Sequence, residues 1–171
     1  MTNDTPKTIH LSDYQPPAFL VEQVALEFDL EPDNTRVLAR MSLRRNPGHG
    51  DAGAPLRLEG EGMELISLAL DGRQMDGAEY AVDAAGLSLV EAPDAFELEV
   101  VTKIAPAANT KLEGLYQSGG IYCTQCEAEG FRRITYFPDR PDVMTTYRVT
   151  VRADRAACPV LLFNGNLAQA G

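Results

Sequence analysis

Residues 19–31 read FLVEQVALEFDLE, and the spacing of their apolar side chains decides the fold class. Apolar residues recur at every second position, and only Glu22 interrupts the series. Period two is the pattern of a half-buried β-strand, because successive side chains of a strand point to opposite faces. The even positions expected to face the core are Leu20, Val24, Leu26, Phe28 and Leu30, and the odd positions include Gln23, Glu27, Asp29 and Glu31.

A second strand is expected directly after the first. Residues Pro32–Asn34 have turn chemistry, and residues 35–45 (TRVLARMSLRR) alternate again. An acidic-faced strand followed by a basic-faced one predicts an antiparallel hairpin with cross-strand charge pairs of about 0.2–1 kcal/mol each. The simpler interpretation is that both charged rows only meet solvent. The core face would carry Val37, Ala39, Met41 and Leu43, and the outer face Arg36, Arg40 and Arg44.

Further short runs with strand character continue along the chain, separated by turn signals such as Asp71–Gly72 and Asp76–Gly77. This spacing predicts an all-β, antiparallel sandwich or meander with little helix, and at most one helical turn at 140–147. The runs are LRLEG (56–60), MELISLAL (63–70), EYAVD (79–83), LSLVEA (87–92), AFELEVVTKI (95–104), TYRVTVRAD (146–154) and PVLLFNGN (159–166).

Size and charge limit the possible functions. The 171 residues fit one domain, which we divide into an extended lead-in at 1–17 and a β domain at 18–171. A net charge of −10 argues against nucleic acid and anionic membranes as partners. The absence of a secretory signal and of any long apolar run, together with only three cysteines, predicts a cytoplasmic protein. The final LAQAG has no closing element, which predicts that the gene continues.

The segment 121–129 (IYCTQCEAE) carries a C-x-x-C spacing and is the strongest candidate for chemistry. If it is extended throughout, Cys123 and Cys126 point to opposite faces, which suits neither a disulfide nor a shared metal. A thiol redox pair and a zinc knuckle remain alternatives, although no paired ligands accompany these two cysteines. The simplest interpretation is that the cysteines are small buried apolar groups. The other possible ligands are Cys158, His10 and His49.

The same extended geometry would place Gln125 and Glu127 side by side on one face. An amide oxygen and a carboxylate are two acceptors directed at one point, and such a pair suits an ammonium group. The alternative is that Glu127 pairs with Arg132 or Arg133. Downstream, the proline-rich stretch 137–142 (FPDRPD) is either a rigid docking surface or a turn held by its own ion pairs.

Residues 109–143 (NTKLEGLYQSGGIYCTQCEAEGFRRITYFPDRPDV) closely resemble the N-terminal domain of the bacterial aminopeptidase N family, which are zinc metallo-aminopeptidases of the gluzincin type. The resemblance extends over nearly the whole chain, including 14–43, 54–61 and 161–166. It implies a saddle-like all-β domain, followed in the parent enzyme by a thermolysin-like catalytic domain, a small β domain and a helical domain.

The resemblance also implies a role for the segment 124–130 (TQCEAEG), which in this family reaches the active site. Gln125 and Glu127 match the family residues that line the substrate pocket and hold the free α-amino group, with a glutamate of a G-x-M-E-N motif elsewhere. The chain has no H-E-x-x-H, so the zinc would belong to the missing catalytic domain. We therefore expect no catalytic residue, metal or cofactor in this chain, and no hydrolysis by it alone.

Several further expectations follow from this resemblance. The partners would be the catalytic domain of the same chain and the N-terminus of a peptide, in a broad-specificity parent enzyme that is monomeric. In the isolated chain, the segment with Gln125 and Glu127 should be mobile or held by crystal or dimer contacts, and Tyr116 and Tyr122 should lie in solvent. The main alternative is a free-standing β-sandwich binding module with a large exposed apolar patch.

Overall fold

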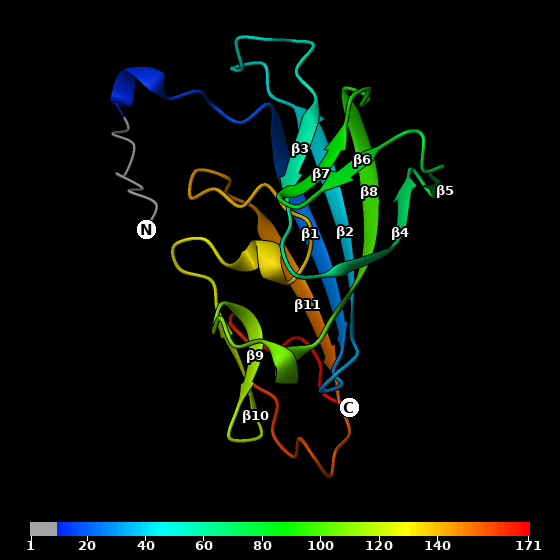
Figure 1. Ribbon diagram of the computed structural model, residues 1–171, viewed down its shortest axis with the longest axis vertical. Helices are drawn as coiled ribbons and strands as arrows, with labels where there is room; N and C mark the ends of the chain where they lie inside the picture. Colours follow the sequence, from blue (N-terminus) through cyan, green and yellow to red (C-terminus); the bar gives the residue numbers. More distant parts are fainter. Residues whose placement is uncertain (1–9) are drawn as a thin grey trace, which may run out of the picture.

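The computed structural model describes residues 10–171, which form three β-sheets with three short 3₁₀ turns and no longer helix (Figure 1). The predicted all-β class is therefore confirmed. The strands are β1 (Phe19–Asp29), β2 (Thr35–Arg45), β3 (Leu56–Glu59), β4 (Glu64–Leu70), β5 (Arg73–Gln74), β6 (Ala81–Asp83), β7 (Gly86–Leu89), β8 (Ala95–Ile104), β9 (Gly114–Ser118), β10 (Ile121–Gln125) and β11 (Thr146–Arg152). The 3₁₀ turns are η1 (Leu11–Asp13), η2 (Pro106–Ala108) and η3 (Phe131–Arg133).

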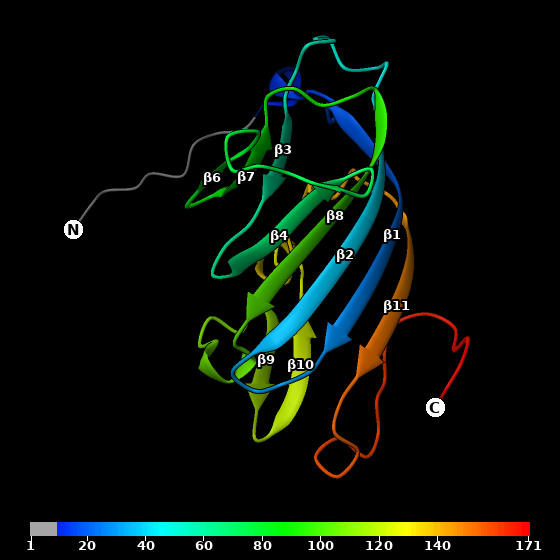
Figure 2. The same cartoon turned by 90° about the vertical axis from the view of Figure 1, so that its right-hand side faces the viewer.

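The largest sheet has six strands in the order β11-β1-β2-β8-β4-β5, and it is strongly twisted (Figure 2). The predicted β1–β2 hairpin is present, with Val24 opposite Met41 and Asp29 opposite Arg36. One pairing is not antiparallel, since the edge strand β11 runs parallel to β1. A single hairpin turn cannot connect parallel neighbours, and here the chain passes through the four other strands of this sheet and both smaller sheets before it returns.

The buried face of β1 differs from the prediction at its start. A register shift between Val21 and Gln23 marks a bulge, and the buried side chains before it are Phe19 and Val21 instead of Leu20. A bulge adds one residue to a strand and so reverses which positions face inward. From Val24 onward the predicted alternation holds.

The core lies between the six-stranded sheet and the three-stranded sheet β3-β7-β6. Leu58 and Leu87 of the small sheet and Met41 and Leu98 of the large one are completely buried in the same cluster. Burying such side chains stabilises the fold by about 1.5–3 kcal/mol each. The small sheet is thus held by the core, and its strand β3, which ends at Glu59, runs toward the lower part of the molecule that contains the β9–β10 hairpin (Figure 1).

The outer face of the large sheet carries the predicted cross-strand charge pairs. Arg40 lies between Glu27 and Glu99, at 3.1 and 2.8 Å, and Arg152 of β11 reaches Glu27 at 2.9 Å. The hydrogen bond from Arg152, with a second one from Arg40, lowers the pKa of Glu27. Charge pairing therefore continues across strands that are distant in sequence, although each exposed pair adds only about 0–1 kcal/mol.

Two expectations about the ends of the chain are wrong or lie outside the description. The apolar run at 159–166 is not a strand and has no strand paired to it within residues 10–171. Its apolar side chains are exposed, Leu162 to 91%, and Phe163 contacts the ring of Phe28. Of the lead-in, residues 1–9 lie outside the described residues, and the described part includes the turn η1.

The proline-rich stretch is a turn held by its own ion pairs. Arg140 bonds both oxygens of Asp142 at 2.9 and 2.7 Å, and Tyr14 donates to the same carboxylate at 3.0 Å. Arg140 also donates to the carbonyl of Gln15 at 2.8 Å, which ties the lead-in to this turn. No helical turn forms at 140–147, where Pro141–Asp142 make a simple turn instead.

Candidate functional site

The candidate site lies at the open end of the β9–β10 hairpin, where β10 stops. The hairpin pairs Gln125 with Gly114, and a turn at residues 127–130 then leads into η3. We call residues 126–130, which contain it, the 126–130 turn. The expected extended backbone through Glu129 is therefore wrong, since the strand ends at Gln125. The peptide bond between Glu127 and Ala128 is cis.

The turn nevertheless keeps Gln125 and Glu127 next to one another. Both are exposed, and the side-chain amide of Gln125 donates to the backbone carbonyl of Glu127 at 3.3 Å. This bond occupies the amide nitrogen of Gln125 and leaves its side-chain oxygen as an acceptor. Gln125 and Glu127, the two residues that the sequence singled out, are therefore in contact, held by a turn and not by a common strand face.

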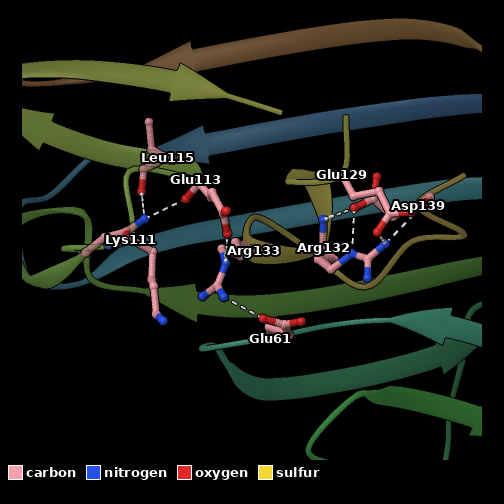
Figure 3. Close-up of polar contacts among 9 residues, drawn as sticks. Glu61, Lys111, Glu113, Leu115, Glu129, Arg132, Arg133 and Asp139 are labelled. Atoms are coloured by element: carbon pink, nitrogen blue, oxygen red, sulfur yellow. Dashed lines mark hydrogen bonds and ion pairs between the residues drawn. The ribbon is translucent and has the colours of Figure 1, made fainter. Parts of the chain in front are cut away.

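The alternative pairing of Glu127 with an arginine is wrong. Arg132 pairs with Glu129 at 2.9 Å and with Asp139 at 2.8 Å (Figure 3). Arg133 points to the other side, to Glu113 at 3.0 Å and to Glu61 at 2.5 Å (Figure 3). Within residues 10–171 no ion pair involves Glu127. Its carboxylate is thus the one on this turn that carries a negative charge without a partner.

The position of the turn depends on close backbone contacts at Gly130. A side-chain carbon there would lie 2.7 Å from the carbonyl oxygen of Gln125 and 2.9 Å from the Cα atom of Cys126. Both obstacles are backbone, which cannot rotate away as a flexible side chain would. Glycine at this position therefore lets the turn fold back onto the end of β10.

Two acidic residues outside the turn, Asp139 and Glu59, support it through Arg132. The Asp139 carboxylate accepts from both the backbone N–H and the guanidinium Nε of Arg132, at 3.2 and 2.8 Å. Glu59 in turn accepts from the backbone N–H of Asp139 at 3.0 Å. Asp139 stood in a stretch predicted to form ion pairs, but nothing in the sequence pointed to Glu59, which is 80 positions away.

An aromatic group borders the turn on the side of β11. Phe131 packs edge-on against Phe137 and Tyr147, with ring centroids 4.9 and 6.0 Å apart. Burial raises the pKa of Tyr147 to about 12. Tyr116 and Tyr122 were expected to lie in solvent, but both are half-buried. Tyr122 packs on the main core. The hairpin is thus anchored to the domain on one side.

The three cysteines are free thiols. Burial raises the pKa of the Cys126 thiol to about 11, and the neighbouring Asp139 carboxylate adds to the rise. Redox exchange and metal binding both need a thiolate. In the part of the chain from His10 onward, no three histidine, cysteine or acidic side chains come together as metal ligands. The thiol environment therefore favours the interpretation of Cys126 as a packing residue.

We expect Cys126 to react with iodoacetamide at pH 8 about 20-fold more slowly in the folded chain than in urea. The reason is that a higher pKa lowers the fraction of thiolate by a larger factor than it raises the nucleophilicity of each thiolate. Its rate should rise roughly tenfold per pH unit between 7 and 10, since the thiolate fraction grows with pH below the pKa. Peptide-level mass spectrometry measures both rates. Equal rates in folded and denatured chains would reinstate the redox interpretation.

Comparison with known proteins gives one consistent result. Residues 63–170 match the family model described as the Peptidase M1 N-terminal domain. The chain is 52% identical to aminopeptidase N of Caulobacter vibrioides over 171 residues, all of this chain and 19% of that protein. It is 42% identical to aminopeptidase N of Escherichia coli over 94% of this chain and 18% of that one. The chain thus spans about a fifth of the length of these relatives.

Solved structures agree with this match. The crystal structure of Legionella pneumophila aminopeptidase A in complex with aspartic acid superposes with a TM-score of 0.85 at 34% identity, covering 93% of this chain and 19% of that one. A zinc metallopeptidase of Deinococcus radiodurans, bound to a Tyr-Ser-Ala substrate, gives a TM-score of 0.64 at 13% identity, over 81% of this chain and 33% of that one. The second likeness shows the fold alone.

Proposed function

Because this chain belongs to the M1 peptidase family, as its N-terminal domain, we propose that it anchors the free α-amino group of peptide substrates in a broad-specificity zinc aminopeptidase. Glu127 supplies the negative charge and Gln125 a second acceptor. A charge-assisted hydrogen bond to an ammonium group is roughly twice as strong as a neutral one. The domain thereby selects substrates with a free N-terminus and removes no residue by itself.

The observation that carries this proposal is the unpaired Glu127 carboxylate on a supported, exposed turn. The neighbouring acids Glu113, Glu129 and Asp139 are each paired with an arginine. A carboxylate left free beside an amide oxygen is suited to a ligand that brings its own positive charge. An acetylated N-terminus brings none, so it would not be held.

The reaction itself needs groups that residues 10–171 do not bring together. Zinc in such enzymes activates a water molecule, and its sites use about three protein ligands. Among residues 10–171 no such set of side chains forms, and burial raises the pKa of the Cys126 thiol to about 11. The residues present therefore do not fit a zinc ion, and we assign the metal and the hydrolytic step to a catalytic domain of the same, longer polypeptide.

The exposed apolar end of the chain is consistent with contact to such a domain. Val160, Leu161, Leu162 and Phe163 are 45–91% exposed in one run. Contiguous apolar surface of this kind marks interaction sites. We propose that in a monomeric, cytoplasmic parent enzyme this run packs against another part of the polypeptide. No helix within residues 10–171 is long and apolar enough to cross a membrane.

The same apolar run supports a second candidate function, that of a free-standing module that binds another protein. This alternative explains the run at 160–163 but gives no role to the unpaired Glu127. The two functions differ in what happens to a substrate with a blocked N-terminus when the domain is part of a longer enzyme, because only the first one needs the ammonium group.

The test compares hydrolysis of alanine p-nitroanilide and its N-acetyl form by this chain alone and by a longer polypeptide that carries it. We expect no turnover by the chain alone, even with stoichiometric zinc. The longer polypeptide should cleave the free-amine substrate at least about 100-fold faster than the acetylated one, since the acetyl group removes the charge that Glu127 holds. Zinc-dependent turnover by the repurified chain, or equal cleavage of both substrates, would overturn the assignment.

A further inference from the structure

The turn that carries Glu127 is joined to three separate parts of the domain through two consecutive arginines. Arg132 is directed to Glu129 in the turn and to Asp139 beyond it (Figure 3). Arg133 is directed to Glu113, before β9, and to Glu61, after β3 (Figure 3). The side chains of both arginines are about 80% buried, so these arginines are less exposed to screening by salt than Arg40 and Arg152 on the outer sheet face.

Arg132 makes the larger number of these contacts. Its Nε donates to the Asp139 carboxylate at 2.8 Å, one terminal nitrogen donates to the Asp139 carbonyl at 3.1 Å, and that nitrogen also lies 2.9 Å from Glu129. Its backbone carbonyl accepts from the N–H of Glu61 at 2.9 Å. A planar guanidinium with several donors holds such partners in a fixed geometry, which a lysine cannot do.

Asp139 completes the connection to the β-sandwich. It is 8% exposed, and its backbone N–H donates to Glu59 at the end of β3. Glu59 is also bridged to Phe137 through two backbone hydrogen bonds of 2.9 and 3.1 Å. A continuous series of contacts thus runs from the small sheet through Asp139 and Arg132 to Glu129, two residues from Glu127. We call these four residues, Glu59, Asp139, Arg132 and Glu129, the Arg132 network.

From this geometry we propose that Arg132 is a positioning residue, which holds the 126–130 turn in place so that the Glu127 carboxylate meets the substrate ammonium group. The proposal rests on the anchoring function proposed above. Arg132 itself touches no substrate. It acts because a misplacement of about 1 Å at an anchoring group can lower the rate strongly. The network also means that the turn is supported within this chain, where the sequence predicted a mobile segment.

The first experiment measures the order of the turn in the isolated chain. Backbone ¹⁵N relaxation should give order parameters of about 0.85 for residues 126–130, falling below about 0.6 in Arg132→Gln. Values in β1 and β2 should not change. Glu129→Gln removes only the ion pair between Glu129 and Arg132 at the exposed end of the network, so this variant should fold like the wild type. Arg73→Gln is the matched control, since Arg73 forms a two-point ion pair with Glu79 at the β5 edge of the large sheet, outside the network.

The second experiment measures steady-state kinetics of the same variants in a longer polypeptide. Arg132→Gln should raise KM for a free-amine substrate about 5- to 10-fold, with a smaller change in kcat, because anchoring is weakened while the reacting groups stay intact. Arg132→Lys should recover only part of the loss, since lysine lacks the planar fork. Arg73→Gln should leave both constants unchanged.

These outcomes separate the proposal from the function on which it rests. A turn that is already disordered in the wild-type chain, or that keeps its order in Arg132→Gln, would overturn the positioning role. A loosened turn with an unchanged KM would overturn it as well. The anchoring function fails by a different result, namely an unchanged KM in a variant that lacks Glu127 itself.

Discussion

Replacing Glu127 with alanine in a longer polypeptide that carries this domain is expected to lower kcat/KM for free-amine substrates by about 30- to 1000-fold. Truncating one partner of a desolvated charge pair costs about 2–4 kcal/mol, and each 1.36 kcal/mol is a factor of ten. KM should rise and kcat should fall, because the anchor also sets the position of the bond to be cut. Initial rates over a range of alanine p-nitroanilide concentrations measure both constants.

Two further variants separate charge from shape. Glu127→Gln keeps the size of the side chain and an acceptor oxygen but removes the charge, so it should lose most of the effect if the ammonium group is the ligand. Glu91→Ala removes an exposed acid that makes no ion pair within residues 10–171, and it should behave like the wild type. If Glu127→Ala retained wild-type kinetics, the anchoring role of this domain would be wrong.

The sequence predicted the strands best where the pattern is local. In β1 and β2 the alternation from Val24 to Asp29 and from Ala39 to Leu43 reflects burial of one face against the core, and it is visible within ten residues. The bulge beyond Val21 was not predictable in this way. Its position depends on how β1 pairs with β2, which the side-chain pattern of a single strand does not contain.

The run at 159–166 shows the opposite failure. Its composition is that of a strand, but a strand forms only where another strand offers hydrogen bonds, and within residues 10–171 this run has none. In contrast, β11 does find a partner, although it is β1, more than 120 positions earlier, and the pairing is parallel. Pairing partners at such separations are decided by the whole fold and not by local propensity.

The sequence predicted that two residues of the candidate site are neighbours, but not the backbone conformation that places them. Gln125 and Glu127 are neighbours, as expected, yet a turn and not an extended strand brings them together. The residues between Cys126 and Glu129 include no glycine, proline or asparagine, so no local turn signal precedes Gly130. The conformation of this turn depends on the close approach of Gly130 to the backbone of Gln125 and on the ion pairs of Arg132. The ion pair with Asp139 involves a residue outside the turn.

Gly86→Ala is expected to lower the free energy of unfolding by about 3–5 kcal/mol, the largest effect on stability that a single added methyl group should have in this chain. Gly86 has φ of +155°, which L-residues rarely adopt. A Cβ atom there would lie 2.0 Å from the carbonyl oxygen of Leu58 and 3.0 Å from the Cα atom of Glu59. Because both are backbone atoms of the paired strand β3, the clash can be relieved only by moving the strands apart.

Urea denaturation measures the loss, with Gly77→Ala as the control. No atom lies within 4 Å of a Cβ atom at Gly77, so that variant should stay within about 1 kcal/mol of the wild type. An unchanged midpoint in Gly86→Ala would mean that β3 and β7 separate without cost. The small sheet would then not hold Glu59 in a fixed position. If the midpoint falls as expected, the 126–130 turn should also lose order, although Gly86 is far from it in sequence. The reason is that Glu59, the residue paired with Gly86, is also the one that holds Asp139 and through it Arg132.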